Sequence, residues 1–271
     1  MRSGAGDFIM LRMLDLAGRT CVVTGASSGI GAAAAVELAR RGAVPVLAAR
    51  RRAELEEVAS RIRSTGGTAH VLDVDLASPE GNERLVKFAL EKTGRLDVFI
   101  ANAGVTMVQR FQDAKLETFE QVMRVNYFGT LYGFKAALPH VLEKKGQLVV
   151  VSSFTGKRGV PTRSGYAASK HALHGLANSL RVELLGTGVG VTIYCPGFVD
   201  TEIRKRAVER HEKADEVAPK GWTPEQAALV LVRAVARRKR EVVTPFFLRM
   251  VLRVDLVAPS LVDWLLRRRF G

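Results

Sequence analysis

The chain has 271 residues, a formal net charge of +14 and only two cysteines. Two cysteines exclude a disulfide framework and a multi-cysteine metal cluster, so Cys21 and Cys195 are expected to be buried thiols. The length is large for one domain, but no linker or internal repeat divides it.

The first nineteen residues carry Asp7, Arg12 and Asp15 within their apolar stretch. An export signal has an uninterrupted apolar core, and this stretch lacks one. We therefore treat residues 1–17 as an N-terminal extension and expect a cytoplasmic protein.

A glycine-rich segment, TGASSGIG from Thr24 to Gly31, lies between a strand-like run at 20–23 and an alanine-rich helical segment at 32–41. Gly25, Gly29 and Gly31 allow backbone conformations and close approaches that a Cβ would block. A helix that starts here offers free N–H groups and a positive dipole end to a pyrophosphate. A tight turn without a ligand is the simpler alternative when this segment is considered alone. Strand, glycine turn and helix in this order predict a nucleotide-binding turn.

The second predicted strand, 44–49, ends at Ala49 and is followed by Arg50, Arg51 and Arg52. An acidic residue at this point would bind the adenosine ribose 2′-hydroxyl and favour NAD. Here there is no acid, and guanidinium groups suit a 2′-phosphate. A solvated basic helix start is the alternative. We predict NADP(H) in preference to NAD(H), with Arg50 as the main contact.

The remaining chain alternates between helical and strand-like segments. Helices are predicted at 54–64, 80–92, 119–142, around Tyr166 and from Thr223 to about 238; strands are predicted at 69–72, 96–101, 146–151, 190–194 and 241–243. Thr223, Pro224 and Gln226 have the pattern of an N-cap with a capping box. Strands alternating with helices of this length form parallel βαβ units. The sequence predicts one α/β domain over 18–245, a Rossmann-type doubly wound parallel sheet of about seven strands.

Tyr166 and Lys170 are four residues apart in the segment YAASK. On a helix they share one face, so an ammonium can stand beside a phenol. At roughly 4 Å and an effective dielectric near 20, that charge contributes about 4 kcal/mol, enough to lower the phenol pKa by about 3 units. Ser153 follows a predicted buried strand, and its hydroxyl could hold a substrate oxygen against the phenol. Either feature alone also occurs by chance, as a surface helix pair or a turn serine.

Six segments in this order resemble the single-domain short-chain dehydrogenase/reductase family. They are TGASSGIG, ANAG at 101–104, Asn126, Ser153, YAASK and PGFVDT at 196–201. The resemblance implies a Rossmann-type fold, a nicotinamide cofactor and a catalytic tetrad of Asn126, Ser153, Tyr166 and Lys170. In such a tetrad tyrosine is the acid/base, lysine lowers its pKa and holds the nicotinamide ribose, serine orients the substrate, and asparagine keeps a relay water in place. Ala101 departs from the asparagine of many members.

The resemblance also implies the cofactor contacts. Asp73 would lie at the adenine, and the full predicted set is Gly25, Ser27, Gly29, Ile30, Gly31, Arg50, Arg51, Asp73, Val74, Asn102, Ala103, Gly104, Tyr166, Lys170, Pro196, Gly197, Val199 and Thr201. Members usually pair through the helices at 119–142 and around Tyr166, so a homodimer or homotetramer is expected.

The substrate is expected beyond the carboxyl ends of the strands, as in other open α/β sheets. Candidates for the pocket wall are mostly apolar: Val105, Phe154, Gly156, Val160, Phe198 and Val199. The charged stretch at 202–220 is expected to form a mobile lid with a short exposed helix. These residues favour a hydrophobic ketone, aldehyde or secondary alcohol over a charged sugar phosphate.

The last forty residues hold half of the excess positive charge, with ten Arg and Lys against three acids. Residues 246–271 form an amphipathic basic tail, in which Phe246, Phe247 and Met250 begin an apolar stripe. Packing over the cleft or in a subunit interface is the favoured interpretation, with contact to an anionic membrane surface as the alternative. Arg249, Arg253 and Asp255 interrupt the apolar run, so it is too short to span a bilayer. No recognition motif accompanies the charge, so no nucleic acid is expected.

Other functional classes have less support. A non-catalytic NADP sensor could lose the tetrad, yet all four positions are filled. An epimerase or dehydratase of the same fold generally has another glycine spacing and a larger substrate domain. His171 and His174 are three residues apart on the Tyr166 helix but have no third ligand nearby in the sequence, so no metal is predicted.

Overall fold

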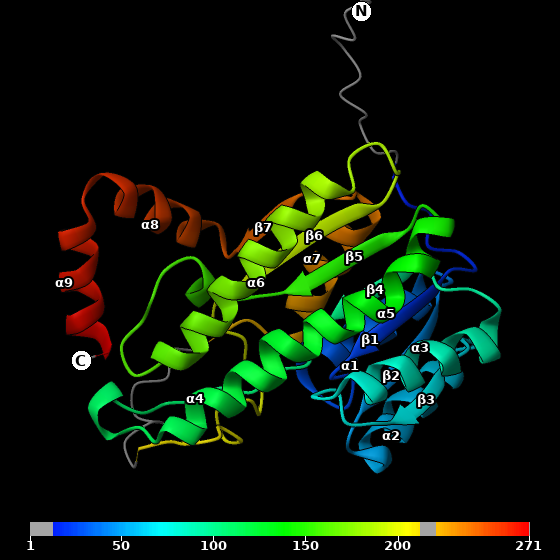
Figure 1. The fold of residues 1–271 in the computed structure, drawn as a ribbon, viewed down its shortest axis with the longest axis horizontal. Helices are drawn as coiled ribbons and strands as arrows, with labels where there is room; N and C mark the ends of the chain where they lie inside the picture. Colours follow the sequence, from blue (N-terminus) through cyan, green and yellow to red (C-terminus); the bar gives the residue numbers. More distant parts are fainter. Residues whose placement is uncertain (1–12, 212–220, 271) are drawn as a thin grey trace, which may run out of the picture.

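The computed structural model describes residues 13–211 and 221–270 (Figure 1). Seven parallel strands form one sheet in the order β3-β2-β1-β4-β5-β6-β7. The strands are β1 Thr20–Thr24, β2 Val44–Ala49, β3 His70–Asp73, β4 Val98–Ala101, β5 Gln147–Val151, β6 Gly190–Pro196 and β7 Glu241–Thr244. The helices are α1 Gly29–Arg40, α2 Arg52–Arg63, α3 Pro79–Thr93, α4 Leu116–Met123, α5 Gly129–Glu143, α6 Ser164–Glu183, α7 Pro224–Ala236, α8 Phe246–Val257 and α9 Pro259–Phe270. This confirms the predicted doubly wound sheet.

Helices cover both faces of the sheet, which explains why the central strands are mostly apolar. Strands β1, β4 and β5 are buried along their whole length, as expected for a parallel sheet between two helical layers. One core cluster packs α1, α2 and α7 against the sheet, and the other packs α3, α5 and α6 against the opposite face. The layers hold the strand ends, and the residues that follow them, in fixed positions.

The predicted long helix at 119–142 is interrupted in the structure. A π-helical segment, Arg124–Phe128, joins α4 to α5 and contains Asn126. Such widened turns often occur at functional sites, because they re-aim one side chain. The predicted capping box of α7 is confirmed: Thr223 Oγ1 accepts from Gln226 N, and Gln226 Oε1 accepts from Thr223 N.

The predicted lid helix is not seen in the described part of the segment. Residues 202–206 form turns, and Val208 N and Val108 N donate to Thr106 O and Glu209 O, respectively. The remainder of the predicted lid, 212–220, lies outside the described residues. Among the described helices, none has the length and apolar character that crossing a membrane requires.

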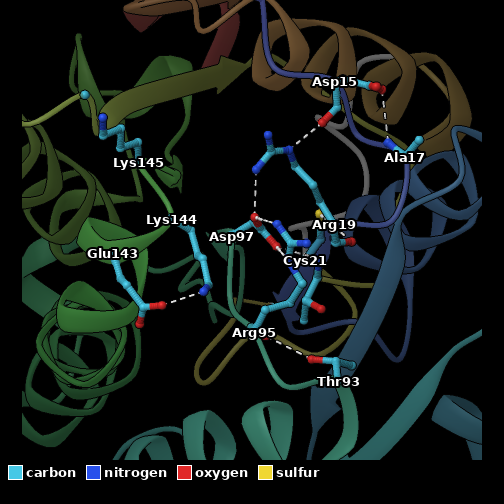
Figure 2. Close-up of polar contacts among 12 residues, drawn as sticks. Asp15, Ala17, Arg19, Cys21, Thr93, Arg95, Asp97, Glu143, Lys144 and Lys145 are labelled. Atoms are coloured by element: carbon cyan, nitrogen blue, oxygen red, sulfur yellow. Dashed lines mark hydrogen bonds and ion pairs between the residues drawn. The ribbon is translucent and has the colours of Figure 1, made fainter.

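At the amino edge of the sheet, Asp97 is a buried carboxylate that joins β1 to β4. Arg19 Nη1 and Arg95 Nη2 both donate to Asp97 Oδ1 at 2.7 Å, as Figure 2 shows, and Thr20 N donates to Oδ2 at 3.0 Å. Burial alone would raise the pKa of Asp97, but the hydrogen bonds from Arg95, Thr20 and Arg19 outweigh it and hold that pKa below its usual value. This cluster lies at the opposite edge from the residues predicted to be functional.

Candidate active site

A cleft opens where β1 and β4 leave the sheet side by side. From β1 the strand order runs outward in one direction to β3 and from β4 in the other direction to β7. The crevice between two such strands is the usual place for a ligand in an open α/β sheet. Twelve of the predicted cofactor and substrate residues line this cleft: Gly25, Ser27, Gly29, Ile30, Arg50, Arg51, Val74, Asn102, Ala103, Gly104, Val105 and Thr201. Sequence reasoning missed several other lining residues, among them Ser28, Asp75, Leu76 and Arg206. Of these only Ser28 falls within a motif.

The glycine turn has no room for side chains at its key positions. Gly25 and Gly29 have positive φ angles of 66° and 57°. A Cβ on Gly25 would lie 2.8 Å from Ala103 Cα, and one on Gly31 would lie 2.5 Å from Asn102 Nδ2 and also collide with Gly25 O. Gly31 therefore lies behind the cleft and lets α1 pack closely against the turn.

The turn is fastened to the segment after β4. Thr24 Oγ1 accepts from the backbone N–H groups of Asn102 and Ala103 at 2.9 and 3.0 Å. In return, Asn102 Nδ2 donates to Thr24 O at 2.9 Å. Two segments almost eighty residues apart thus form the two walls of one cleft.

Arg51, rather than Arg50, is bonded to the glycine turn. Arg51 Nη2 donates to Ser27 Oγ at 2.8 Å and to Ser28 Oγ at 3.0 Å, and Arg51 Nη1 pairs with Glu54 at 2.8 Å. Ser28 is the N-cap of α1 but makes no side-chain bond to the helix. The first N–H groups of α1 are therefore left for a ligand. Arg50 also lines the cleft, with an exposed side chain.

Asp73 does not line the cleft in this structure. Its carboxylate pairs with Arg52 Nη1 at 2.7 Å on the surface, whereas Val74 and Asp75 line the cleft. The hydrogen bond from Arg52 holds the pKa of Asp73 below its usual value. Arg52, the third arginine after β2, therefore forms an ion pair within the protein.

Ser153, Tyr166 and Lys170 lie close together next to the cleft wall at Gly104, although none of the three lines the cleft itself. The Ser153 side chain, just after β5, interacts with the Tyr166 hydroxyl on α6 and opposes the rise that burial causes in its pKa. Lys170 Nζ donates to Val151 O at 2.9 Å and lies 5.7 Å from the centre of the Tyr166 ring. A Cβ on Gly104 would lie only 3.6 Å from Lys170 Nζ, so the cleft wall passes directly beside the ammonium.

The pKa of Tyr166 differs from the expectation. Burial raises it, and the charge of Arg163 and the hydrogen bond from Ser153 only partly offset that effect. Burial also lowers the pKa of Lys170 to about 8. The sequence-based estimate placed the ammonium roughly 4 Å from the phenol and neglected desolvation. In the structure the protein's own groups do not acidify the phenol below its usual pKa.

The buried Asn126 side chain clamps the cleft wall to α6. Its Oδ1 accepts from Val105 N at 2.8 Å, and its Nδ2 donates to Val105 O at 3.0 Å and to Ser169 Oγ at 2.9 Å. Both amide hydrogens are therefore occupied. The resemblance implied that Asn126 holds a relay water, but its side chain has no free N–H to donate to one.

Comparison with known proteins agrees with this geometry. The family model for short chain dehydrogenases matches residues 19–212. The chain belongs to the short-chain dehydrogenase family.

Curated members resemble it over almost the whole chain. An 11-beta-hydroxysteroid dehydrogenase A of Sesamum indicum is 34% identical over 93% of this chain and 76% of its own length. A hydroxysteroid 11-beta-dehydrogenase 1-like protein of Xenopus tropicalis is 35% identical over 94% of this chain and 88% of its own length.

Two solved structures show the same architecture. A short-chain dehydrogenase/reductase of Burkholderia phymatum in complex with NAD has a TM-score of 0.84 at 25% identity, over 92% of this chain and 96% of its own. An alcohol dehydrogenase of Thermococcus sibiricus complexed with 5-hydroxy-NADP has a TM-score of 0.74 at 29% identity, over 83% of this chain and 95% of its own. The present short-chain dehydrogenase is thus an oxidoreductase with a nucleotide-binding Rossmann fold, consistent with action on CH–OH and C=O groups.

Arg163 is a cation beside the predicted active site that sequence reasoning missed in this short-chain dehydrogenase. It precedes Tyr166 by three residues, and its Nη1 donates to a neutral group, Thr106 Oγ1, at 3.4 Å. Burial, and then the nearby charge of Arg204, lower the pKa of Arg163 to about 10. Its position at the start of α6 could have been noticed, but nothing in the sequence shows that its guanidinium is buried.

Behind the predicted active site, the fold brings His174 together with Cys195 and Glu241. His174 Nε2 lies 3.1 Å from Ser152 Oγ and 3.6 Å from Cys195 Sγ, and Nδ1 lies 3.7 Å from Glu241. His174 thus lies with Cys195 and Glu241 as potential ligands, which the sequence did not suggest, whereas His171, its predicted neighbour in the pair, contacts Ala167 O. Burial lowers the pKa of His174 to about 4 and raises that of Cys195, so both groups are neutral near pH 7.

The PGFVDT segment borders the cleft with its last residue only. Thr201 lines the cleft, whereas Pro196, Gly197 and Val199 do not. Gly197 packs under Leu248 of α8, where a Cβ would lie 2.5 Å from Leu248 Cδ1. Val199 forms a bridge with Trp222.

The predicted substrate residues divide into two groups. Phe154 and Val160 are buried in the core, and a Cβ on Gly156 would lie 2.5 Å from Ser152 Oγ. Phe198 is half-buried, with its ring 5.9 Å from that of Phe270 and the Arg204 guanidinium 4.8 Å from its centre. Val105 and Phe198 are therefore the better placed candidates.

Proposed function

We propose that this short-chain dehydrogenase uses NADP(H) to interconvert a carbonyl and a secondary alcohol on an apolar substrate, with Tyr166 as the acid/base. The observation that carries this proposal is that Ser153 and Lys170 both lie beside the Tyr166 side chain. In this arrangement a proton donor, a second hydroxyl and an ammonium stand together beside the cleft wall at Gly104.

The described residues fit a dinucleotide. Gly25 and Gly31 leave no space for a Cβ, the N-terminus of α1 has no side-chain cap, and Arg51 reaches the serines of the turn. These features suit a pyrophosphate and a 2′-phosphate. The strand end at Ala49 has no acid that would favour a free 2′-hydroxyl. Arg50 and Arg51 are the proposed phosphate contacts, which favours NADP(H).

The bound nicotinamide would supply or accept the hydride. In reduction, the Tyr166 hydroxyl gives its proton to the carbonyl oxygen, and Ser153 donates a hydrogen bond to the same oxygen. In oxidation, the Tyr166 phenolate takes the proton of the alcohol. Lys170 stabilises that phenolate and binds a ribose hydroxyl. Asn126 positions Val105 and the cleft wall relative to α6.

The proposed substrate is apolar and large enough to reach Phe198. Val105 lines the cleft, and Phe198 is half-buried three residues before Thr201, which also lines it. The names of the relatives, hydroxysteroid dehydrogenases, support an alicyclic secondary alcohol or ketone as the first class to test. Self-association through α5 and α6 is also proposed, because Phe128, directly before α5, and Val182, on α6, expose 40% and 65% of their surface.

Steady-state kinetics with a panel of apolar ketones tests the proposal. We expect NADPH to be preferred over NADH, and Tyr166→Phe to lower kcat about 10²- to 10⁴-fold while NADPH binding, followed by its fluorescence, persists. A preference for NADH would overturn the cofactor assignment. Full turnover by Tyr166→Phe would overturn the acid/base assignment.

A further inference from the structure

The C-terminal helix pair, α8 and α9, exposes most of the large apolar surface of the described chain. Figure 1 shows the pair extending from the end of β7 and standing out from the sheet. Nine of the fifteen exposed large apolar side chains among the described residues belong to it, including Phe247, Leu256, Val257 and Trp264, exposed by 61, 85, 83 and 54%. An apolar surface of this density is unusual on a protein that meets only water.

The inner side of the pair is anchored to the domain. Leu248 is buried against Gly197, Val262 is 2% exposed, and the Phe270 ring lies 5.9 Å from that of Phe198. Arg158 pairs with Asp255 at 2.8 Å and also with Asp263. The pair is therefore a packed part of the fold, and its apolar surface is exposed in a defined orientation.

The charges of the helix pair indicate which kind of partner its outer surface could bind. Residues 246–270 contain five arginines and two acids, a net charge of 5 − 2 = +3. Both acids are paired with Arg158, whereas Arg249, Arg253, Arg267, Arg268 and Arg269 are exposed and make no acidic pair among the described residues. The Arg268 guanidinium lies 5.5 Å from the centre of the Trp264 ring, so charge and apolar surface are adjacent. Two copies of this surface would bring like charges together, whereas anionic headgroups would neutralise them.

We propose that the outer surface of the C-terminal helix pair docks the protein on an anionic lipid bilayer. The apolar side chains enter the interface while the arginines contact headgroup phosphates, as in other amphipathic helices that lie in the interface plane. Because the inner side packs on Phe198, docking holds the substrate end of the cleft next to the bilayer. Only this last consequence rests on the proposed function.

Flotation with vesicles tests the docking without measuring turnover. The full chain should float with phosphatidylglycerol/phosphatidylcholine vesicles and not with phosphatidylcholine alone, and high salt should reverse binding. The triple variant Arg267→Gln, Arg268→Gln, Arg269→Gln should bind roughly a hundredfold more weakly, since each arginine contributes roughly fivefold. The matched control Arg40→Gln, Arg61→Gln, Arg233→Gln removes three exposed arginines elsewhere and should float like wild type.

A second pair of variants separates the apolar contribution. Phe247→Ser with Leu256→Ser should abolish flotation, whereas Phe111→Ser with Leu116→Ser, which are exposed by 74 and 77% away from the helix pair, should not. NADPH binding verifies that each variant is folded. Absence of flotation by the wild type, or equal flotation of both variant pairs, overturns the proposal. It is also overturned if Phe247→Ser with Leu256→Ser dissociates a dimer while the wild type fails to float, because the surface is then an interface between copies.

Discussion

The pKa of Tyr166 depends on the charge of Arg163, a residue that belongs to none of the sequence motifs. Burial raises the pKa of Tyr166, and Arg163 is the cation whose charge opposes that rise. Removing the cation should therefore raise the phenol pKa further. The direction of this effect can be measured in the pH dependence of the reaction.

We expect Arg163→Met to move the pH profile for alcohol oxidation to higher pH. Oxidation needs the phenolate, so its rate rises with pH through the phenol pKa and the whole rise shifts with that pKa. Arg163→Lys keeps the charge and should retain the wild-type profile. If both variants lose activity without a shift, Arg163 is a structural residue only.

Arg51 allows a separate test of cofactor choice. Its guanidinium is bonded to Ser27 and Ser28, where a 2′-phosphate is proposed to bind. Arg51→Gln should lower kcat/KM for NADPH about 10- to 100-fold, the equivalent of one charged hydrogen bond, and leave that for NADH nearly unchanged. Arg61→Gln, on the exposed side of α2, is the control. Equal loss with both cofactors would contradict the assignment.

At the scale of elements, the site depends on how closely α1 approaches the segment after β4. Gly31→Ala places a methyl group against Asn102 Nδ2 and Gly25 O. We expect this variant to weaken NADPH binding at least about tenfold and to destabilise the fold by about 1–3 kcal/mol. Gly175→Ala, in open space on α6, should instead be neutral or stabilising by about 0.5–1 kcal/mol. Calorimetry and NADPH titration distinguish the two.

The interrupted helix between α4 and α5 shows a limit of periodicity. The apolar pattern predicted one helix at 119–142. This segment is helical along its whole length, but residues 124–128 widen into a π-helical turn. The three hydrogen bonds of Asn126 compensate for the irregular turn. Its partners, Val105 and Ser169, lie 21 and 43 residues away, so no local pattern could predict them.

At the scale of the whole molecule, the buried ion-pair cluster and the proposed active-site cleft lie at opposite ends of the strands. Asp97 and its two arginines close the amino edge, and the cleft opens at the carboxyl edge. Asp97→Ala should destabilise the protein by about 3 kcal/mol, because it leaves Arg19 and Arg95 without their buried partner. NADPH binding by the folded fraction should persist, which an urea titration with and without NADPH can measure.

The same cluster predicts a pH dependence of stability. The pKa of Asp97 is lower in the folded chain than its usual value of about 3.9. Its stabilising contribution is therefore complete above about pH 4 and is lost as pH falls through the folded pKa. The difference in unfolding free energy between wild type and Asp97→Ala should shrink below pH 4. A difference that stays constant to pH 2 would show that the charge is not responsible.

Local periodicity and short spacings along the chain were enough to predict the sheet, the glycine turn and the group Ser153, Tyr166 and Lys170. Tertiary structure decided which arginine meets the glycine turn, that Asp73 pairs with Arg52, and that Asn126 has no free amide hydrogen. It also decided that the apolar stripe of the C-terminal helices is exposed. Each of these outcomes depends on partners distant in the chain and on the cost of burying charge, and both are set only when the helices pack on the sheet.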